Sequence, residues 1–145
     1  MRVLITNNTL TQRAGTELYV RDLALALRSR GHEPVAFSTL LGEVAEELSQ
    51  SGVRVIDDLS LLAEKPDIIH GHHHVETMMA LLHFLDVPAI YFCHGFLPWE
   101  EAPLHFPRVM RYVPGTLSAA KLVSCICILL LACAFIVLFK NWIPS

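Results

Sequence analysis

The 145-residue chain lacks charge over a long C-terminal stretch and has little cysteine elsewhere. Residues 122–139 hold no charged side chain, and Ser124 is their only residue that is not apolar. Three of the four cysteines lie in this run, which leaves only Cys93 for the rest of the chain and excludes a disulfide framework or a cysteine-based zinc site there. As a helix the run would span about 27 Å, which predicts one C-terminal transmembrane helix.

The charges around the apolar run predict its orientation. Arg108, Arg111 and Lys121 precede it and only Lys140 follows, so the positive-inside rule predicts a single-pass C-terminal anchor in membrane lipid with the head cytoplasmic. The alternative is a buried core helix. We divide the chain into a head (1–113), a linker (114–121), the transmembrane helix (122–139) and a short tail (140–145).

The head also lacks an excess of basic charge and several common motifs. It carries all 14 acidic and nine of the 11 basic residues, a net charge of −5, which argues against nucleic acid as a partner. G-x-G-x-x-G and a phosphate-loop lysine are both missing, which argues against a dinucleotide-binding site and against a P-loop site. H-E-x-x-H is missing too, and we predict no metal site.

Strand-like and helix-like segments alternate along the head. Apolar, β-branched runs predict strands at residues 2–6, 34–38, 53–56, 68–70, 89–93 and 108–113, and helical spacing predicts helices at 16–30, 43–50 and 75–85, with a helical turn at 59–64. This alternation predicts an α/β fold, a Rossmann-like parallel sheet with helices on both faces. The binding crevice is expected where the strand order reverses, between the first and fourth strands.

Three loops at the carboxyl ends of predicted strands should converge there. In the first, Gly15 lets a ligand approach the backbone, and the helix start from Thr16 offers free N–H groups to a phosphate. In the second, four histidines fall in five positions, and neutral imidazoles such as His72 and His73 suit ligand hydroxyls or phosphates. Two purely structural alternatives stay open: Gly15 as a simple turn residue and His70 as a core residue.

The third loop begins Cys93-His94-Gly95 and continues into an aromatic and acidic stretch. Trp99 is a candidate for stacking on a sugar ring, and Glu100 or Glu101 is a candidate general base. Packing of Trp99 against the sheet and a solvated Glu100 remain the alternatives.

Taken in order, these segments resemble the N-terminal half of a family 4 glycosyltransferase, the GT-B type with two Rossmann-like domains facing a cleft. The resemblance rests on Val3-Leu4-Ile5, Ala14-Gly15-Thr16-Glu17, Gly31-His32, Pro66-Asp67-Ile68-Ile69-His70-Gly71-His72 and Tyr91-Phe92-Cys93-His94-Gly95. It implies transfer of a sugar from a nucleoside-diphosphate sugar to a lipid or saccharide acceptor, with no further cofactor. It also implies that Gly15 meets the donor diphosphate, that His72 lines the cleft and that His94 is catalytic, contacting the donor sugar.

The resemblance has two departures. Ala14 stands where the family often has a second glycine, and no segment matches the donor-binding half with its E-x7-E motif. We therefore expect a truncated transferase that is inactive alone and is completed by a second Rossmann-like chain. Three alternatives remain: a non-catalytic membrane-anchored binding module, a frameshifted fragment of a full transferase and, last, a Rossmann oxidoreductase.

Overall fold

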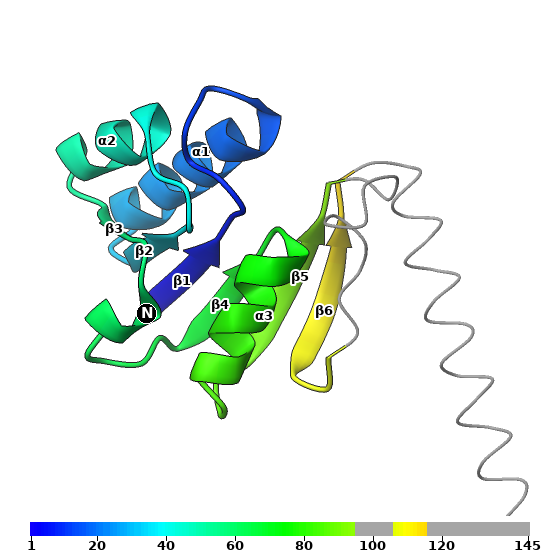
Figure 1. The fold of residues 1–145 in the computed structure, drawn as a ribbon. Coiled ribbons are helices and arrows are strands. Elements are labelled where there is room, and N and C mark those ends of the chain that lie inside the picture. The colour runs from blue at the N-terminus through cyan, green and yellow to red at the C-terminus, as the bar shows by residue number, and fades with distance from the viewer. Residues whose placement is uncertain (95–105, 116–145) are drawn as a thin grey trace, which may run out of the picture.

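The computed structural model describes residues 1–94 and 106–115 of the chain. Six strands and three α-helices alternate in this part (Figure 1). The strands are β1 (Arg2–Thr6), β2 (Glu33–Phe37), β3 (Arg54–Ile56), β4 (Ile68–Gly71), β5 (Ala89–Cys93) and β6 (Val109–Pro114). The helices are α1 (Gly15–Ser29), α2 (Glu43–Gln50), α3 (His74–His83) and the short 3₁₀ helix η1 (Leu59–Leu61).

All six strands pair in parallel in one sheet with the order β3-β2-β1-β4-β5-β6. The predicted Rossmann-like parallel sheet is thus confirmed, and the order reverses between β1 and β4 as expected. Predicted and observed boundaries differ by up to three residues, as at the end of η1, because helix and strand ends are set by local hydrogen bonds that periodicity does not report.

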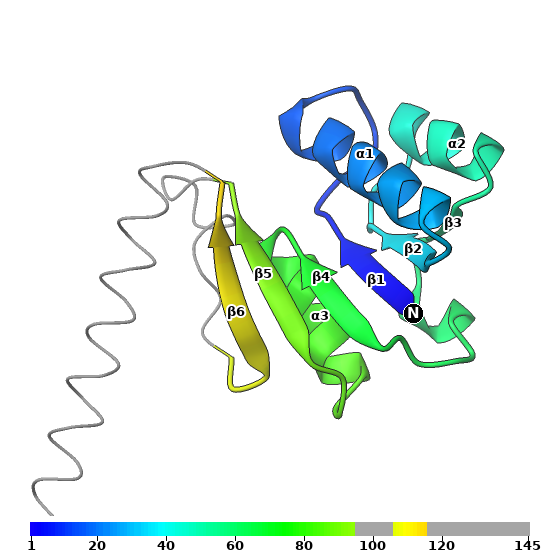
Figure 2. The same cartoon turned by 180° about the vertical axis from the view of Figure 1, so that it is seen from behind.

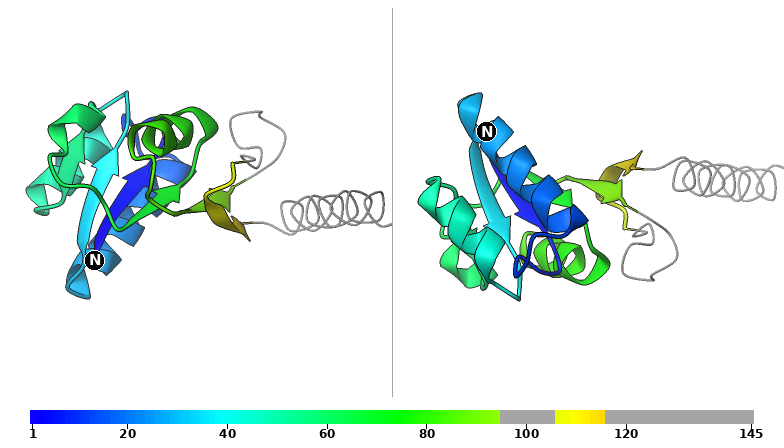
Figure 3. Two further views of the ribbon diagram at one scale, coloured as in Figure 1. Left: turned by 90° about the horizontal axis from the view of Figure 1, so that it is seen from below. Right: turned by 90° about the horizontal axis from the view of Figure 1, so that it is seen from above.

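Alternate residues of each strand build two separate cores on the two faces of the sheet. On one face, Leu4 and Ile69 pack with Leu81 of α3. On the other, Ile5 packs with Val20 and other apolar residues of α1 and α2. Figure 1 shows α3 in front of β4 and β5, Figure 2 shows the same strands from behind, and Figure 3 shows the molecule from below and from above.

The C-terminal end of α3 is closed by a side chain that is distant in sequence. The half-buried Arg108 guanidinium donates to the carbonyl oxygens of Phe84 (2.6 Å), Val87 (2.9 Å) and Leu81. Leu81 lies in the last turn of α3, where carbonyls lack intrahelical partners, and Phe84 and Val87 follow that helix. Arg108 therefore ties the start of β6 to α3.

The loop after β1 is fixed against the loop before α2. The backbone N–H of Leu10 donates to Leu40 O (2.8 Å), and that of Glu43 donates to Thr11 O (3.0 Å). A Cβ at Gly42 would lie 2.7 Å from the Thr11 Cα, so only glycine permits this approach.

The predicted transmembrane helix, residues 122–139, lies outside the described residues. Among residues 1–94 and 106–115, no helix has the length and apolar character needed to cross a membrane.

Candidate functional site

Histidines and aromatic rings gather at the carboxyl ends of β4 and β5. His70 lies in β4 and His72 one residue beyond it, while Phe92 lies in β5 and His94 directly follows that strand. Residues two apart in an extended chain point to the same face of a sheet. Ile68, in the same series, packs with the core under α1. The period of the strands thus directs the four rings to the α1 face.

Three imidazoles form a hydrogen-bonded chain across the two strands. Nδ1 of His70 lies 3.0 Å from Nε2 of His72, and Nδ1 of His72 lies 2.7 Å from Nε2 of His94. His72 is fully buried and uses both ring nitrogens in this chain. His70 and His94, at the two ends of the chain, are both partly buried.

Burial keeps these rings neutral. Desolvation lowers the pKa of His70 and of His94 from 6.5 to about 4, and it lowers the pKa of His72 well below 6.5. Neighbouring imidazoles act in the same direction, because a second positive charge nearby would be unfavourable. Near neutral pH each ring therefore has one N–H donor and one nitrogen acceptor.

Tyr19 of α1 covers the histidine chain. Its ring centroid lies 5.3 Å from that of His72, 5.4 Å from that of His94 and 4.6 Å from that of Phe92. Burial also raises the pKa of the Tyr19 phenol. Since Tyr19 lies four residues after Gly15, this contact brings the first turns of α1 to the histidines.

His73 joins the end of β1 to the same edge. Its Nδ1 lies 2.7 Å from Oδ1 of Asn7, and the two side chains are buried. The Asn7 amide nitrogen donates to Thr9 O at 2.7 Å, which assigns Oδ1 as the acceptor from His73. The His73 ring stacks at 6.1 Å from that of His94, so loops from β1, β4 and β5 converge here.

Gly15 and Thr16 form the first turn of α1, whose N-cap residue Ala14 makes no side-chain capping bond. Gly15 is exposed, and no atom lies within 4 Å of where its Cβ would be. The Thr16 hydroxyl donates to the buried Glu17 carboxylate at 2.9 Å. An uncapped helix start with open space in front of it is suited to an anion.

The structure thus brings together His72, His73 and His94 and sets Gly15 and Thr16 one helical turn from Tyr19. The remaining two predicted site residues, Trp99 and Glu100, lie outside the described residues.

Sequence reasoning missed the roles of Tyr19 and Phe92 in this cluster. The signal for Phe92 was available, because Phe92 and His94 repeat with period two beside His70 and His72 on the neighbouring strand. Tyr19 was harder to find, since an aromatic residue in an amphipathic helix is ordinarily assigned to the core.

Two further observations bear on the chemistry of this part of the chain. Burial raises the pKa of the Cys93 thiol, on the α3 face, to about 11, so it stays protonated and is a poor nucleophile. Within the described ranges, no three side chains of histidine, cysteine, aspartate or glutamate are arranged to hold a metal ion.

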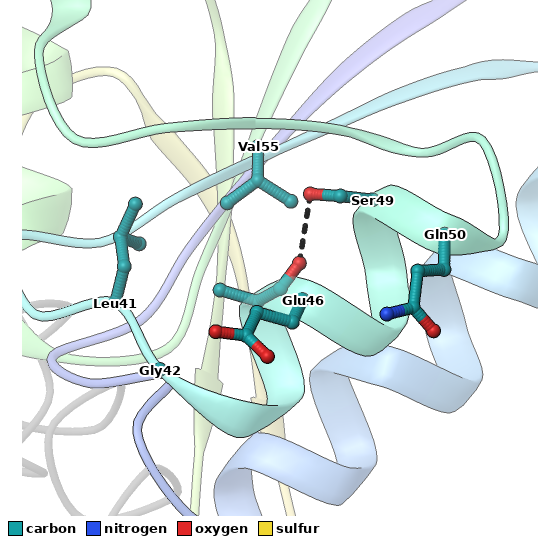
Figure 4. Close-up of a pocket in the computed structure, with 7 residues that line it drawn as sticks. Leu41, Gly42, Glu46, Ser49, Gln50 and Val55 are labelled. Atoms are coloured by element: carbon teal, nitrogen blue, oxygen red, sulfur yellow. Dashed lines mark hydrogen bonds between the residues drawn. The ribbon is translucent and has the colours of Figure 1, made fainter.

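A pocket of about 410 Å³ lies elsewhere, between α2 and β3 (Figure 4). Its wall includes Glu46, Gln50 and Val55, and the Ser49 hydroxyl there donates to Ala45 O at 2.8 Å. The histidine cluster contributes no residue to it. We assign the candidate site to the carboxyl ends of β4 and β5 around His72, His73 and His94, here called the histidine edge. Tyr19 joins these neutral imidazoles to the first turns of α1, whose start is uncapped.

Comparison with known proteins gives one match. The model of the family described as Glycosyltransferase Family 4 matches residues 13–127, which is most of the chain. The match extends past Val113 through the predicted linker and into the first residues of the predicted transmembrane helix. No curated protein and no solved structure matches the chain.

Proposed function

Since the chain belongs to glycosyltransferase family 4, we propose that its head is the acceptor-side, N-terminal domain of a sugar transferase. The proposed reaction moves a sugar from a nucleoside-diphosphate sugar to a lipid or saccharide acceptor. The observation that carries the proposal is the contact of Tyr19 with both His72 and His94, which joins α1, β4 and β5 at the reversal of strand order.

The electrostatics of this edge suit a diphosphate and a sugar on neighbouring positions. The uncapped first turn at Gly15 and Thr16 offers backbone N–H groups and the positive end of the helix dipole to the diphosphate. His94, a neutral and partly exposed imidazole, offers a hydrogen bond to an oxygen of the donor sugar. Trp99 and Glu100 are proposed to line the acceptor side of the same edge.

We propose further that transfer needs a second Rossmann-like domain, supplied by a longer form of the chain or by a partner chain. The described residues form one sheet, which supplies one wall of a donor site. Closing a site around the donor strengthens its hydrogen bonds and excludes water. The head without that domain is therefore expected to bind a donor weakly and to transfer little.

Release of nucleoside diphosphate from UDP-glucose and GDP-mannose, measured with and without a donor-binding domain, tests the proposal without knowledge of the acceptor. We expect turnover only with the second domain. Replacing His94 by alanine should lower it at least about tenfold, the effect of losing one hydrogen bond to the reacting group.

His83→Ala is the matched control, because His83 is an exposed histidine of α3. Turnover unchanged by His94→Ala would contradict the proposed role of this residue. Donor binding without turnover for every donor-binding domain tried would favour the non-catalytic binding module.

The apolar run at residues 122–139 supports a separate proposal, a single-pass membrane anchor with the head cytoplasmic. Such a chain stays in the membrane pellet after alkaline carbonate washing and is released by detergent. Deleting residues 122–145 should move the head to the soluble fraction. Release of the full chain by carbonate alone would contradict the anchor.

A further inference from the structure

The order of the three imidazoles places the fully buried His72 between two partly buried rings, His70 and His94. His70 lies within β4, His72 follows that strand and His94 follows β5. His72 has both nitrogens within hydrogen-bond distance of its neighbours and none left for a ligand. For His94 only Nε2 is engaged within the described residues, and its Nδ1 is the nitrogen available to a ligand.

Neutral imidazoles make such a chain directional. Each ring has one proton, so a ring that accepts at one nitrogen must donate from the other. If His70 donates from Nδ1, then His72 accepts at Nε2 and donates from Nδ1 to Nε2 of His94. The proton of His94 is then on Nδ1. If the chain runs the other way, His94 donates from Nε2 and its Nδ1 is a bare acceptor.

The distances between the rings are the same for both directions. In either direction His94 is left with a single tautomer, because its Nε2 either accepts or donates in the 2.7 Å contact to His72.

We propose that His70 and His72 are positioning residues, which through their hydrogen-bond chain hold His94 in one tautomer and so fix whether its Nδ1 donates to the ligand or accepts from it. The ligand atom is an oxygen of the nucleoside-diphosphate sugar, a point that rests on the proposed function. The tautomer itself rests only on the contacts between the three rings.

Aromatic rings pack around the chain of imidazoles. The rings of Tyr19 and Phe92 pack against it. Nδ1 of His73 is directed to Asn7 instead. Within the described residues, no carboxylate forms a hydrogen bond or ion pair with His70, His72 or His94.

The test is long-range ¹H–¹⁵N spectroscopy of the full chain in detergent, labelled with ¹⁵N-histidine, at pH 7.5. This readout assigns each ring nitrogen as protonated or bare and needs no ligand. In the unmodified chain we expect His94 to be neutral and in a single tautomer, with one ring nitrogen protonated and the other bare. A mixture of the two tautomers, or a charged ring, would overturn the proposal even if every variant failed to fold.

Two variants of His70 separate the hydrogen bond from its packing. His70→Asn keeps an amide nitrogen on Cγ, where Nδ1 is bonded, whereas His70→Phe keeps a ring without a donor. We expect His70→Asn to preserve the tautomer of His94 and His70→Phe to produce a mixture of the two. A folded His70→Phe chain with His94 unchanged would show that His70 does not set the direction.

Binding of UDP-glucose and GDP-mannose to the same samples, in the presence of a donor-binding domain, separates this inference from the proposed function. If His70→Phe also weakens binding at least fivefold while His70→Asn does not, the role toward the ligand is supported. If His94 has a single tautomer and neither sugar nucleotide binds, the positioning chain stands and the proposed function fails.

Discussion

The two faces of β4 and β5 are built from alternate residues of the same strands and yet differ in chemistry. On the α3 face, Ile69 and Tyr91 are fully buried in a core that is almost entirely apolar. On the α1 face, His70 and Phe92 continue into a hydrogen-bonded chain of imidazoles beneath a single aromatic ring. One face stabilises the sheet, and the other presents polar groups at its edge.

The difference shows that stability and binding can be changed by separate substitutions in one parallel sheet. Because side chains alternate, a residue and its neighbour in one strand belong to different environments. Substitutions on the α3 face should therefore change the free energy of unfolding. Substitutions at the histidine edge should mainly change binding.

The largest expected effect is on the α3 face. Leu81→Ala removes a fully buried side chain from the core and should lower the free energy of unfolding by about 2 to 5 kcal/mol. His94→Ala, on the other face, leaves Nδ1 of the buried His72 without its partner and should cost less, about 1 kcal/mol. Urea denaturation of both variants checks this, and equal losses would remove the contrast between the faces.

Arg108→Ala comes next, because it leaves the carbonyls at the end of α3 without a charged donor. We expect a loss of about 2 to 3 kcal/mol in the same denaturation experiment. Arg111→Ala is the control, since Arg111 is exposed in β6 and should stay within about 0.5 kcal/mol of the unmodified chain. Similar values for the two arginines would contradict the capping role.

Gly71 and Gly15 differ in the space around them, and replacing each by alanine compares a closely packed position with an open one. A Cβ at Gly71 would lie 2.5 Å from the side chain of Thr77, whose hydroxyl bonds that of Thr6 at 2.9 Å. Gly71→Ala should therefore cost about 1 to 3 kcal/mol. Gly15→Ala meets no atom and should leave stability unchanged or slightly raised, since alanine favours a helix.

Gly15→Ala also tests whether the donor diphosphate binds at the start of α1. If a diphosphate approaches the backbone at Gly15, the added methyl group should weaken binding of UDP-glucose or GDP-mannose without loss of stability. Titration of the folded variant measures this. Unchanged affinity would return Gly15 to the role of a simple turn residue.

The smallest expected effect is a dependence of stability on pH that arises from the histidine edge. The pKa of His70 and of His94 is about 4 in the folded chain and 6.5 without burial, so the unfolded chain takes up protons first as the pH falls. The free energy of unfolding should decrease between pH 6.5 and about 4 and gain nothing from these rings above that window. Hydrogen bonds lower the pKa of Asp58 and of Asp86, so their contribution is lost below pH 3.8.

His70→Phe removes one of these titrating rings and should flatten the decrease between pH 6.5 and 4. Denaturation at half-unit steps of pH compares its slope with that of the unmodified chain. Equal slopes would mean that the buried imidazoles are not neutral in the folded state.

The fold was accessible from the sequence because each element has a local signature. The helical spacing of α1, its early Glu17 and the closing Gly31, which has a φ of +79°, agree with one another. The cap at the end of α3 was not accessible, because Arg108 lies far along the chain from the carbonyls that it binds. From sequence, Arg108 served only as a charge flanking the apolar run.

The site was accessible in outline and not in its internal contacts. The carboxyl ends of β4 and β5 predicted that His72 and His94 would approach each other, since both follow neighbouring parallel strands. That His72 is fully buried and bonded at both nitrogens depends on side-chain packing from α1, chiefly Tyr19, which a linear pattern does not contain. That His72 lines the cleft stays a prediction, beside its proposed role in supporting His94.

The most direct test of the central claim, that the histidine edge binds a nucleoside-diphosphate sugar, is a titration of the ¹⁵N-labelled full chain with UDP-glucose and GDP-mannose. The account predicts that the ring of His94 and the amide of Gly15 shift together, weakly but saturably, with one dissociation constant for the donor that binds. Shifts confined to the pocket between α2 and β3, or no shift at His94 with either donor, would contradict it.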